Sequence, residues 1–360
     1  MRCERKYNFR KHHADPVMNL KSKNRSTRLI GVEIETDSVD LSNTYDLSRI
    51  CSQWGAQITK DGSTDGPEVV LAPTAGQKFL DQVNDICSAL DECDAKVSRD
   101  CGLHIHTDGG DFSWYDLRRL IIFYSLVEDA LYAMCPKSRN PGGSQYRDYC
   151  KKIKPSLVTY LIRDDNPKRS KLNIIESLYE TSSTKEAKTT KWGSARYYGL
   201  NLHSWLFRGT FEFRMPPGTV QSSKIIPWGV IFASIVDFAY KTREEDILEL
   251  RRKNPKLYGC DKEESSLRLL LCIVPKWVRP WIIKRINKFK RTSRTMEQYE
   301  EVVTNWDVYG DPNRGKLPLP VSNDYLIKQI MESTFSRPQT FSFNESINPS
   351  KYMRYVREVA

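Results

Sequence analysis

The stretch GVEIE, residues 31–35, alternates apolar and acidic side chains. In an extended strand, residues i and i+2 lie on the same face, roughly 6.5 to 7 Å apart. The valine and the isoleucine therefore face one side, whereas Glu33 and Glu35 face the other. The pattern predicts a strand from about Arg28 to Thr36 that has one apolar face and one face carrying two carboxylates.

Two later stretches repeat this alternation. In CGLHIH, residues 101–106, the leucine and the isoleucine oppose His104 and His106. In FEFR, which begins at position 211, two phenylalanines oppose Glu212 and Arg214. An antiparallel sheet commonly packs one face on a core and leaves the other open. If the three strands are neighbours, they place these charged and imidazole side chains on one open face.

Carboxylates that crowd one face repel one another, which raises their pKa values unless cations neutralise them. Hard divalent cations take oxygen ligands, and protein-bound Mg²⁺ often also contacts substrate phosphates. A single strand with outward glutamates is ordinarily a solvated edge, and a lone HxH is usually a surface or structural pair. The combination of all three patterns favours a metal and phosphate site.

Three more polar residues lie close to predicted strands. Glu68 begins a short apolar strand, residues 68–71, that follows two Asp-Gly turns, and it is either a further metal ligand or a strand-start carboxylate. Arg196 and Asn201 flank a strand predicted over 197–202. An arginine can bind a carboxylate or a phosphate through two hydrogen bonds, although an isolated arginine is usually a surface residue.

The composition limits the compartment and the partners. The chain has 360 residues with a net charge of +11, which favours acidic partners such as nucleotides, nucleic acid or anionic polymers. Its nine cysteines show no CxxC spacing, so neither a disulfide framework nor a zinc site is indicated. Because no secretory signal is recognised and the most apolar stretch, residues 225–240, reads as a buried helix, we expect a cytoplasmic protein that does not span a membrane.

Helical spacing predicts amphipathic helices over 76–93 and 113–134, the second started by a capping box of Ser113 and Asp116. Residues 137–191 are expected to be mostly loop with one short helix. Further strands are predicted at 103–107 and 209–215, and the chain from Ser222 onward is expected to be helical. In 277–291, apolar residues oppose four basic ones, Lys284, Arg285, Lys288 and Lys290, which are expected to form a solvated face.

The chain resembles the amidoligase family of the carboxylate-amine ligase superfamily, which is related in fold to glutamine synthetase and glutamate-cysteine ligase. The resemblance rests on GVEIET, DGS followed by PEVVLAP, CGLHIHTD, and RYYGLNL followed by GTFEFRMPPGT, which together bracket roughly residues 28–240. It implies an α+β fold, with a curved antiparallel sheet flanked by helices and a helical C-terminal region. It also implies ATP and two or more Mg²⁺ ions in the saddle of the sheet, with Mn²⁺ as an alternative ion.

The resemblance assigns roles position by position. Five residues match the metal-ligand places: Glu33, Glu35, Glu68, His104 and Glu212. The catalytic places near the phosphates or the acyl phosphate match His106 and Arg214, and the substrate or nucleotide side matches Arg196 and Asn201. The stretch around Glu68 departs from the family pattern, because Pro67 precedes the carboxylate and the strand runs into LAP.

Four parts of the chain are expected: a basic N-terminal arm over 1–28, a catalytic domain over 29–240, a helical basic extension over 241–317, and a tail over 318–360 with one helix near 325–332. The implied reaction joins a carboxylate and an amine through an acyl phosphate. A peptide or an anionic polymer is a candidate substrate, and nucleic acid is a less favoured partner.

Two other readings stay open on the sequence. The fold could serve as a non-catalytic nucleotide- or nucleic-acid-binding module, and the carboxylates could be the acid and base of a glycosidase. Intact Glu33, Glu35, His104 and Glu212 argue against an inactive site. A binding module would show steep salt dependence and form no ADP, and a glycosidase would need neither the histidines nor ATP.

Overall fold

The computed structural model describes residues 28–40, 42, 44–60, 64–141, 149–163, 173, 174, 177, 194–253 and 262–309. Six strands form one sheet in the order β2-β3-β1-β4-β6-β5, and every neighbouring pair is antiparallel. The strands are β1 Ile30–Glu35, β2 Gln57–Lys60, β3 Pro67–Val70, β4 Leu103–Asp108, β5 Leu200–Asn201 and β6 Thr210–Phe213. The predicted antiparallel sheet is confirmed, and its relation to the glutamine-synthetase fold stays a prediction.

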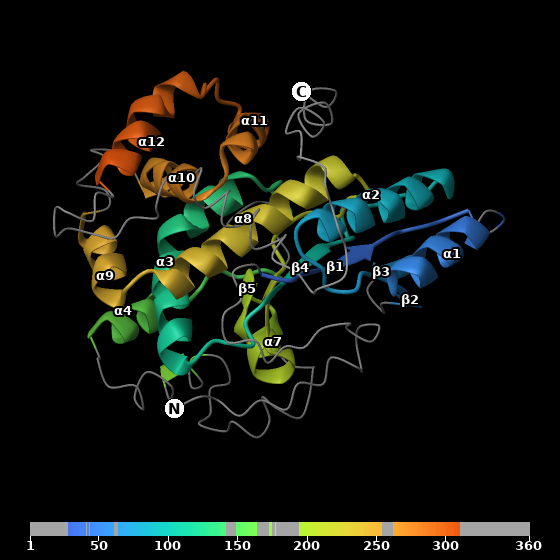
Figure 1. The fold of residues 1–360 in the computed structure, drawn as a ribbon, viewed down its shortest axis with the longest axis horizontal. Helices are drawn as coiled ribbons and strands as arrows, with labels where there is room; N and C mark the ends of the chain where they lie inside the picture. Colours follow the sequence, from blue (N-terminus) through green and yellow to red (C-terminus); the bar gives the residue numbers. More distant parts are fainter. Residues whose placement is uncertain are drawn as a thin grey trace, which may run out of the picture.

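Helices surround this sheet (Figure 1). The α-helices are α1 Thr44–Trp54, α2 Gln77–Glu92, α3 Trp114–Ala133, α4 Pro155–Arg163, α7 Leu202–Arg208, α8 Ser222–Lys241, α9 Glu244–Lys253, α10 Lys262–Ile273, α11 Arg279–Lys290 and α12 Glu297–Tyr309, with 3-10 turns η3 Ser194–Arg196 and η4 Lys276–Val278. The predicted helices over 76–93 and 113–134 are confirmed as α2 and α3. Ser113 and Asp116 form the predicted capping box at the start of α3.

The apolar face of the sheet packs on the long helices. Val32, Ile34 and Ile105 are fully buried, and the ring of Phe213 on β6 stacks on Phe232 of α8 with centroids 4.0 Å apart. Helix α8 packs closely on α2 and β1 at Gly229, where an added Cβ would lie 2.6 Å from the ring of Phe79 on α2 and 3.3 Å from the side chain of Ile30 on β1. This packing leaves the opposite face of the sheet for the polar side chains.

Helix α8 confirms the predicted buried helix over 225–240. Its length and a mean hydropathy of 1.3 would suit a membrane span, but 67% of that window is buried inside the protein. Among the described residues it is the one helix that passes this test. It contacts α2, α3 and β4 and crosses the molecule in Figure 1, which is the position of a core helix.

The strand predicted over 197–202 is largely wrong. Only Leu200–Asn201 forms β5, and the chain then enters α7, which no sequence pattern had indicated. The side chain of Asn201 caps this helix by accepting a hydrogen bond from the Ser204 amide, and Gly209 ends it in the left-handed conformation with φ 79°. A helix of seven residues is too short to show a clear helical period, so its caps were the available signal.

The chain beyond α8 is helical, as expected. Helix α10 packs along α3, and α11 contacts α3 as well. The predicted solvated face is wrong at one residue, because Arg285 is only 8% exposed. Its guanidinium lies 4.8 Å from the centroid of Phe289 and 5.4 Å from that of Trp281. The aromatic rings of the same helix thus cover this cation.

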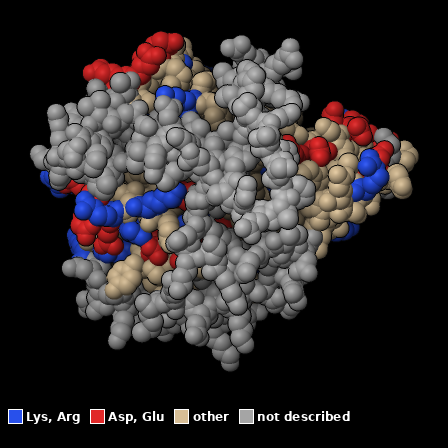
Figure 2. Space-filling model, in the orientation of Figure 1, with Lys and Arg blue, Asp and Glu red and all other residues tan. Residues whose placement is uncertain are grey.

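The described surface mixes charges of both signs. In the face shown in Figure 2, Lys and Arg side chains lie next to Asp and Glu rather than forming one continuous basic field. The predicted basic arm, residues 1–28, lies outside the described residues except at its last position. The tail over 318–360, its helix near 325–332 and most of the loop over 137–191 also lie outside them, while α4 falls where one short helix was expected. The division into four parts stays a prediction.

Candidate functional site

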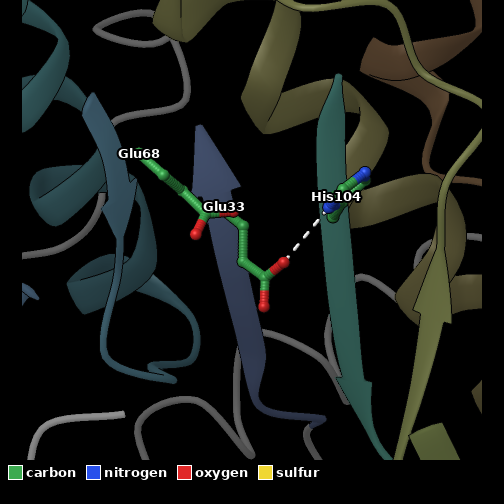
Figure 3. Close-up of side chains that lie close together, drawn as sticks. All are labelled: Glu33, Glu68 and His104. Carbon is green, nitrogen blue, oxygen red and sulfur yellow. Dashed lines mark hydrogen bonds and ion pairs between the residues drawn. The ribbon is translucent and has the colours of Figure 1, made fainter. Parts of the chain in front are cut away.

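The strand register brings the predicted polar residues onto one face. Glu33 on β1 pairs with His104 on β4, Glu35 pairs with Glu68 on β3, and His106 pairs with Glu212 on β6. Figure 3 shows Glu33 in the middle, with Glu68 and His104 on the two flanking strands. The polar face expected if these strands are neighbours is therefore present as one cluster across four adjacent strands, β3, β1, β4 and β6.

Glu33 is the centre of this cluster. Its Oε1 lies 3.1 Å from both His106 Nε2 and Arg208 Nη1, and its Oε2 lies 3.1 Å from His104 Nδ1. Burial alone would raise the pKa of Glu33, but His106, His104 and Arg208 together hold that pKa well below its ordinary value. Glu33 is therefore a carboxylate, the form that binds cations.

Glu212 is a buried carboxylate of the cluster, and its partners lie on the neighbouring strand β5 and directly after its own strand β6. Asn201 Nδ2 donates to Glu212 Oε2 over 2.7 Å, and Arg214 Nη1 donates to Glu212 Oε1. Burial would raise the pKa of Glu212, yet Arg214 and the two histidines lower it below its ordinary value. Arg214 is itself 6% exposed, so the sheet buries this ion pair.

The imidazole of His106 is oriented by two buried hydroxyl groups on the side away from Glu33. Its Nδ1 lies 2.9 Å from Thr210 Oγ1, and that hydroxyl lies 3.0 Å from Ser204 Oγ. All three residues are buried. This chain of hydroxyls fixes the ring so that its other nitrogen, Nε2, faces Glu33.

Glu35 is held at the edge of the cluster. Its Oε2 accepts a hydrogen bond from the amide of Gly102, and its Oε1 lies 3.5 Å from His104 Nε2. Gly102 permits this approach, because a Cβ there would lie 3.0 Å from His104 Nε2 and 3.2 Å from Glu35 Oε2. Buried Arg139 donates to the neighbouring Cys101 carbonyl over 2.6 Å and so adds a cation at this edge.

Two overlapping groups of side chains could hold cations. Glu33, Glu68 and His104 form one group, and Glu33, His106 and Glu212 form the other, each with ligand atoms within 4.8 Å of one another. Carboxylate oxygens suit Mg²⁺ and Mn²⁺, whereas imidazole suits softer ions better. The donor set therefore fits a divalent pair that shares Glu33, and the imidazoles suit Mn²⁺ better than Mg²⁺. Glu35 belongs to neither group, so its predicted role as a ligand stays a prediction.

Two predicted residues lie toward the margins. Glu68 is half-buried, and its carboxylate accepts a hydrogen bond from Thr59 Oγ1 over 3.1 Å. It belongs to the candidate cation-binding group with Glu33 and His104. Arg196 lies in η3, half-buried, with its guanidinium 5.8 Å from the centroid of Tyr197. Because η3 packs on α7, the contacts described for Arg196 relate it to the cluster only indirectly.

Sequence reasoning missed two residues of the site, Arg208 and Thr210. They flank Gly209, which ends α7 and starts the turn into β6. Arg208 falls outside the strand predicted over 209–215, whereas Thr210 lies inside it, two residues before Glu212, so the strand period was a usable signal for its shared face. Recognition of Asn201 and Gly209 as helix caps would have placed Arg208 at a helix end next to the sheet.

Comparison with known proteins identifies one family. A family model described as "Putative amidoligase enzyme" matches residues 44–236. This span covers more than half of the chain and includes β3, β4, β5 and β6 with the site residues that they carry, whereas Glu33 and Glu35 on β1 precede it. No curated protein matches the chain.

Proposed function

The chain belongs to the amidoligase family, and we propose that it is an ATP- and Mg²⁺-dependent carboxylate-amine ligase that works through an acyl phosphate. The observation that carries this proposal is the pair of overlapping ligand groups that share Glu33 on the polar face of the sheet. Such a face suits a nucleotide whose phosphates must be positioned and neutralised rather than attacked covalently by the protein. We further propose that the sheet and its helices have the glutamine-synthetase-like arrangement.

The metal ions would be held by Glu33, Glu68, His104 and Glu212, with His106 as a fifth donor and Glu35 at the edge. When bound, divalent ions neutralise the nucleotide phosphates and the charge that develops during transfer. Glu33 and Glu212 are suited to this role because neighbouring cations keep them ionised despite burial. The hydrogen bond from Asn201 keeps Glu212 in place.

The reaction has two steps. In the first, a substrate carboxylate oxygen attacks the γ-phosphorus of ATP, the bond to the bridging oxygen breaks, and an acyl phosphate and ADP form. In the second, an amine attacks the acyl carbon, phosphate leaves, and the amine nitrogen loses a proton. Arg214 supplies a fixed positive charge beside the phosphates, and we assign His106, Asn201 and Arg196 to the nucleotide and substrate side.

The substrates are a carboxylate and an amine, for which a peptide or an anionic polymer is our candidate. We place the protein in the cytoplasm, which is consistent with the seven described cysteines being buried thiols. A second candidate function keeps the site as a nucleotide- or nucleic-acid-binding module without turnover. The coloured side chains on the face shown in Figure 2 carry charges of both signs and give this alternative no specific support.

The test is to incubate the protein with ATP, Mg²⁺ or Mn²⁺ and a mixed extract of metabolites and peptides. We expect ADP together with new masses equal to two extract components minus one water. Glu33→Gln should abolish ADP formation while the protein stays folded, and Glu92→Gln, an exposed carboxylate at the end of α2, serves as the matched control. Full ADP formation by Glu33→Gln would refute the proposal, and no ADP from the unmodified protein would favour the binding module.

A further inference from the structure

Arg208 is a cation of the site that no motif assigns. It is the last residue of α7, directly before Gly209, and its Nη1 donates to Glu33 Oε1 over 3.1 Å. The positive side chain also lies at the C-terminal end of the helix, where the helix dipole favours cations. The fold thus delivers a guanidinium to the central carboxylate from outside the sheet.

The contacts around Glu33 leave little room for metal ions. A carboxylate offers about four lone-pair sites, and three neighbouring groups, His104, His106 and Arg208, already lie 3.1 Å from its oxygens. Two ions that share Glu33 need at least two of those sites. At least one of the present contacts must therefore give way when ions bind.

Arg208 differs from the other two partners of Glu33. His104 and His106 each belong to one of the ligand groups, so each would offer a ring nitrogen to a bound ion while staying in the site. A guanidinium is always protonated and has no lone pair for a metal. Of the three, Arg208 is the group that a metal ion must repel.

Arg208 is the more exposed of the two arginines that contact the carboxylates of the cluster. The Arg208 side chain is 14% exposed and is attached at a helix end beside a left-handed glycine. Arg214 directly follows β6, and its side chain is 8% exposed and paired with Glu212. The site thus contains a half-buried guanidinium at a helix end, paired with Glu33, and a buried one paired with Glu212.

We infer that Arg208 is a displaceable counter-ion, an inference that rests on the proposed function. Arg208 neutralises Glu33 in the metal-free site. When divalent ions bind, its guanidinium moves to the terminal phosphate of the nucleotide. A planar guanidinium can bind two phosphate oxygens at once. The move keeps the charge balanced, because Arg208 leaves a carboxylate only when an ion replaces it. Arg208 is in this sense a positioning residue for the nucleotide.

The experiment compares Arg208→Gln with the unmodified protein in two titrations. Free Mn²⁺ is followed by electron paramagnetic resonance without nucleotide, and an ATP analogue with a methylene between its β- and γ-phosphorus atoms is then titrated in the presence of Mn²⁺. We expect Arg208→Gln to bind Mn²⁺ about tenfold more tightly, because a competing cation is lost, and to bind the analogue about tenfold more weakly. Thermal unfolding establishes that the variant is folded.

Two further variants separate the effect of the Arg208 charge from that of its shape and from a general effect of losing an arginine. Arg208→Lys retains the charge, so it should bind Mn²⁺ as the unmodified protein does but hold the analogue less tightly. Arg49→Gln is the matched control, since Arg49 makes an exposed ion pair with Asp46 at the same distance of 3.1 Å. If the unmodified protein binds Mn²⁺ and Arg208→Gln binds it no more tightly, the inference is wrong and the proposed function stands. If the unmodified protein binds Mn²⁺ neither alone nor together with the analogue, both are overturned.

Discussion

Glu128 on α3 is a buried carboxyl whose replacement by glutamine should stabilise the protein. The residue is 6% exposed, and its Oε1 accepts a hydrogen bond from the Ile153 amide over 2.9 Å. Burial raises the pKa of Glu128 to about 8, although the Ile153 amide and Lys152 act in the opposite direction. A glutamine oxygen can accept the same hydrogen bond without an ionisable proton.

The size and sign of the effect follow from the two protonation states. The native protein keeps the Glu128 proton up to about pH 8, whereas the unfolded chain loses it near the ordinary pKa of 4.5. Unfolding therefore releases a proton between these values, and the free energy of unfolding falls as pH rises, by about 1.4 kcal/mol per pH unit. At pH 7, about 2.5 units above the ordinary pKa, the loss is about 3.5 kcal/mol.

Urea unfolding of both proteins at several pH values between about 5 and 8 measures this loss. The variant Glu128→Gln should be the more stable protein, and its advantage should grow with pH over that range. Glu92→Gln, at the exposed end of α2, is the control and should show no such growth. An advantage of Glu128→Gln that is equal at pH 5 and pH 8 would refute the reasoning.

Three further predictions concern the site. Glu212→Ala leaves the guanidinium of Arg214 buried without its carboxylate, so urea unfolding should show a loss of about 3 to 5 kcal/mol; a loss below about 1 kcal/mol would contradict the buried ion pair. Gly209→Ala places a side chain at φ 79° and should lower the free energy of unfolding by about 1 to 2 kcal/mol, which thermal unfolding would detect; an unchanged midpoint would speak against the strained turn. Gly102→Ala inserts a Cβ 3.0 Å from His104 Nε2 and should weaken Mn²⁺ binding about tenfold with little change in unfolding; unaltered binding would mean that this edge does not shape the site.

Most of the site prediction came from the alternation of apolar and polar side chains along the strands. It indicated which side of each strand holds Glu33, His104 and Glu212, and the register confirms that they share one face. Alternation contains no information on which strands are neighbours, since pairing between residues far apart in sequence is set by tertiary packing. The position of β1 between β3 and β4 was therefore beyond the sequence argument, which treated the adjacency of these strands only as a condition.

The elements that were missed have weak local signals. Helix α1 buries only Leu47 and Cys51, one turn apart, and β2 is a mostly exposed strand at the sheet edge, so neither shows a clear pattern. The burial of Arg285 was missed for a different reason. A helical pattern classifies residues by polarity, whereas the stem of an arginine can pack on rings of its own helix.

The short helix between β5 and β6 has a consequence for how the site assembles during folding. Asn201 and Glu212 are 11 residues apart, and Glu212 and Arg214 are 2 apart, whereas Glu33 is 71 residues from His104 and 175 from Arg208. Contacts between distant residues require costly loop closure, so local ones form sooner. We expect the β5–α7–β6 half to form first and Glu33 to complete the site last.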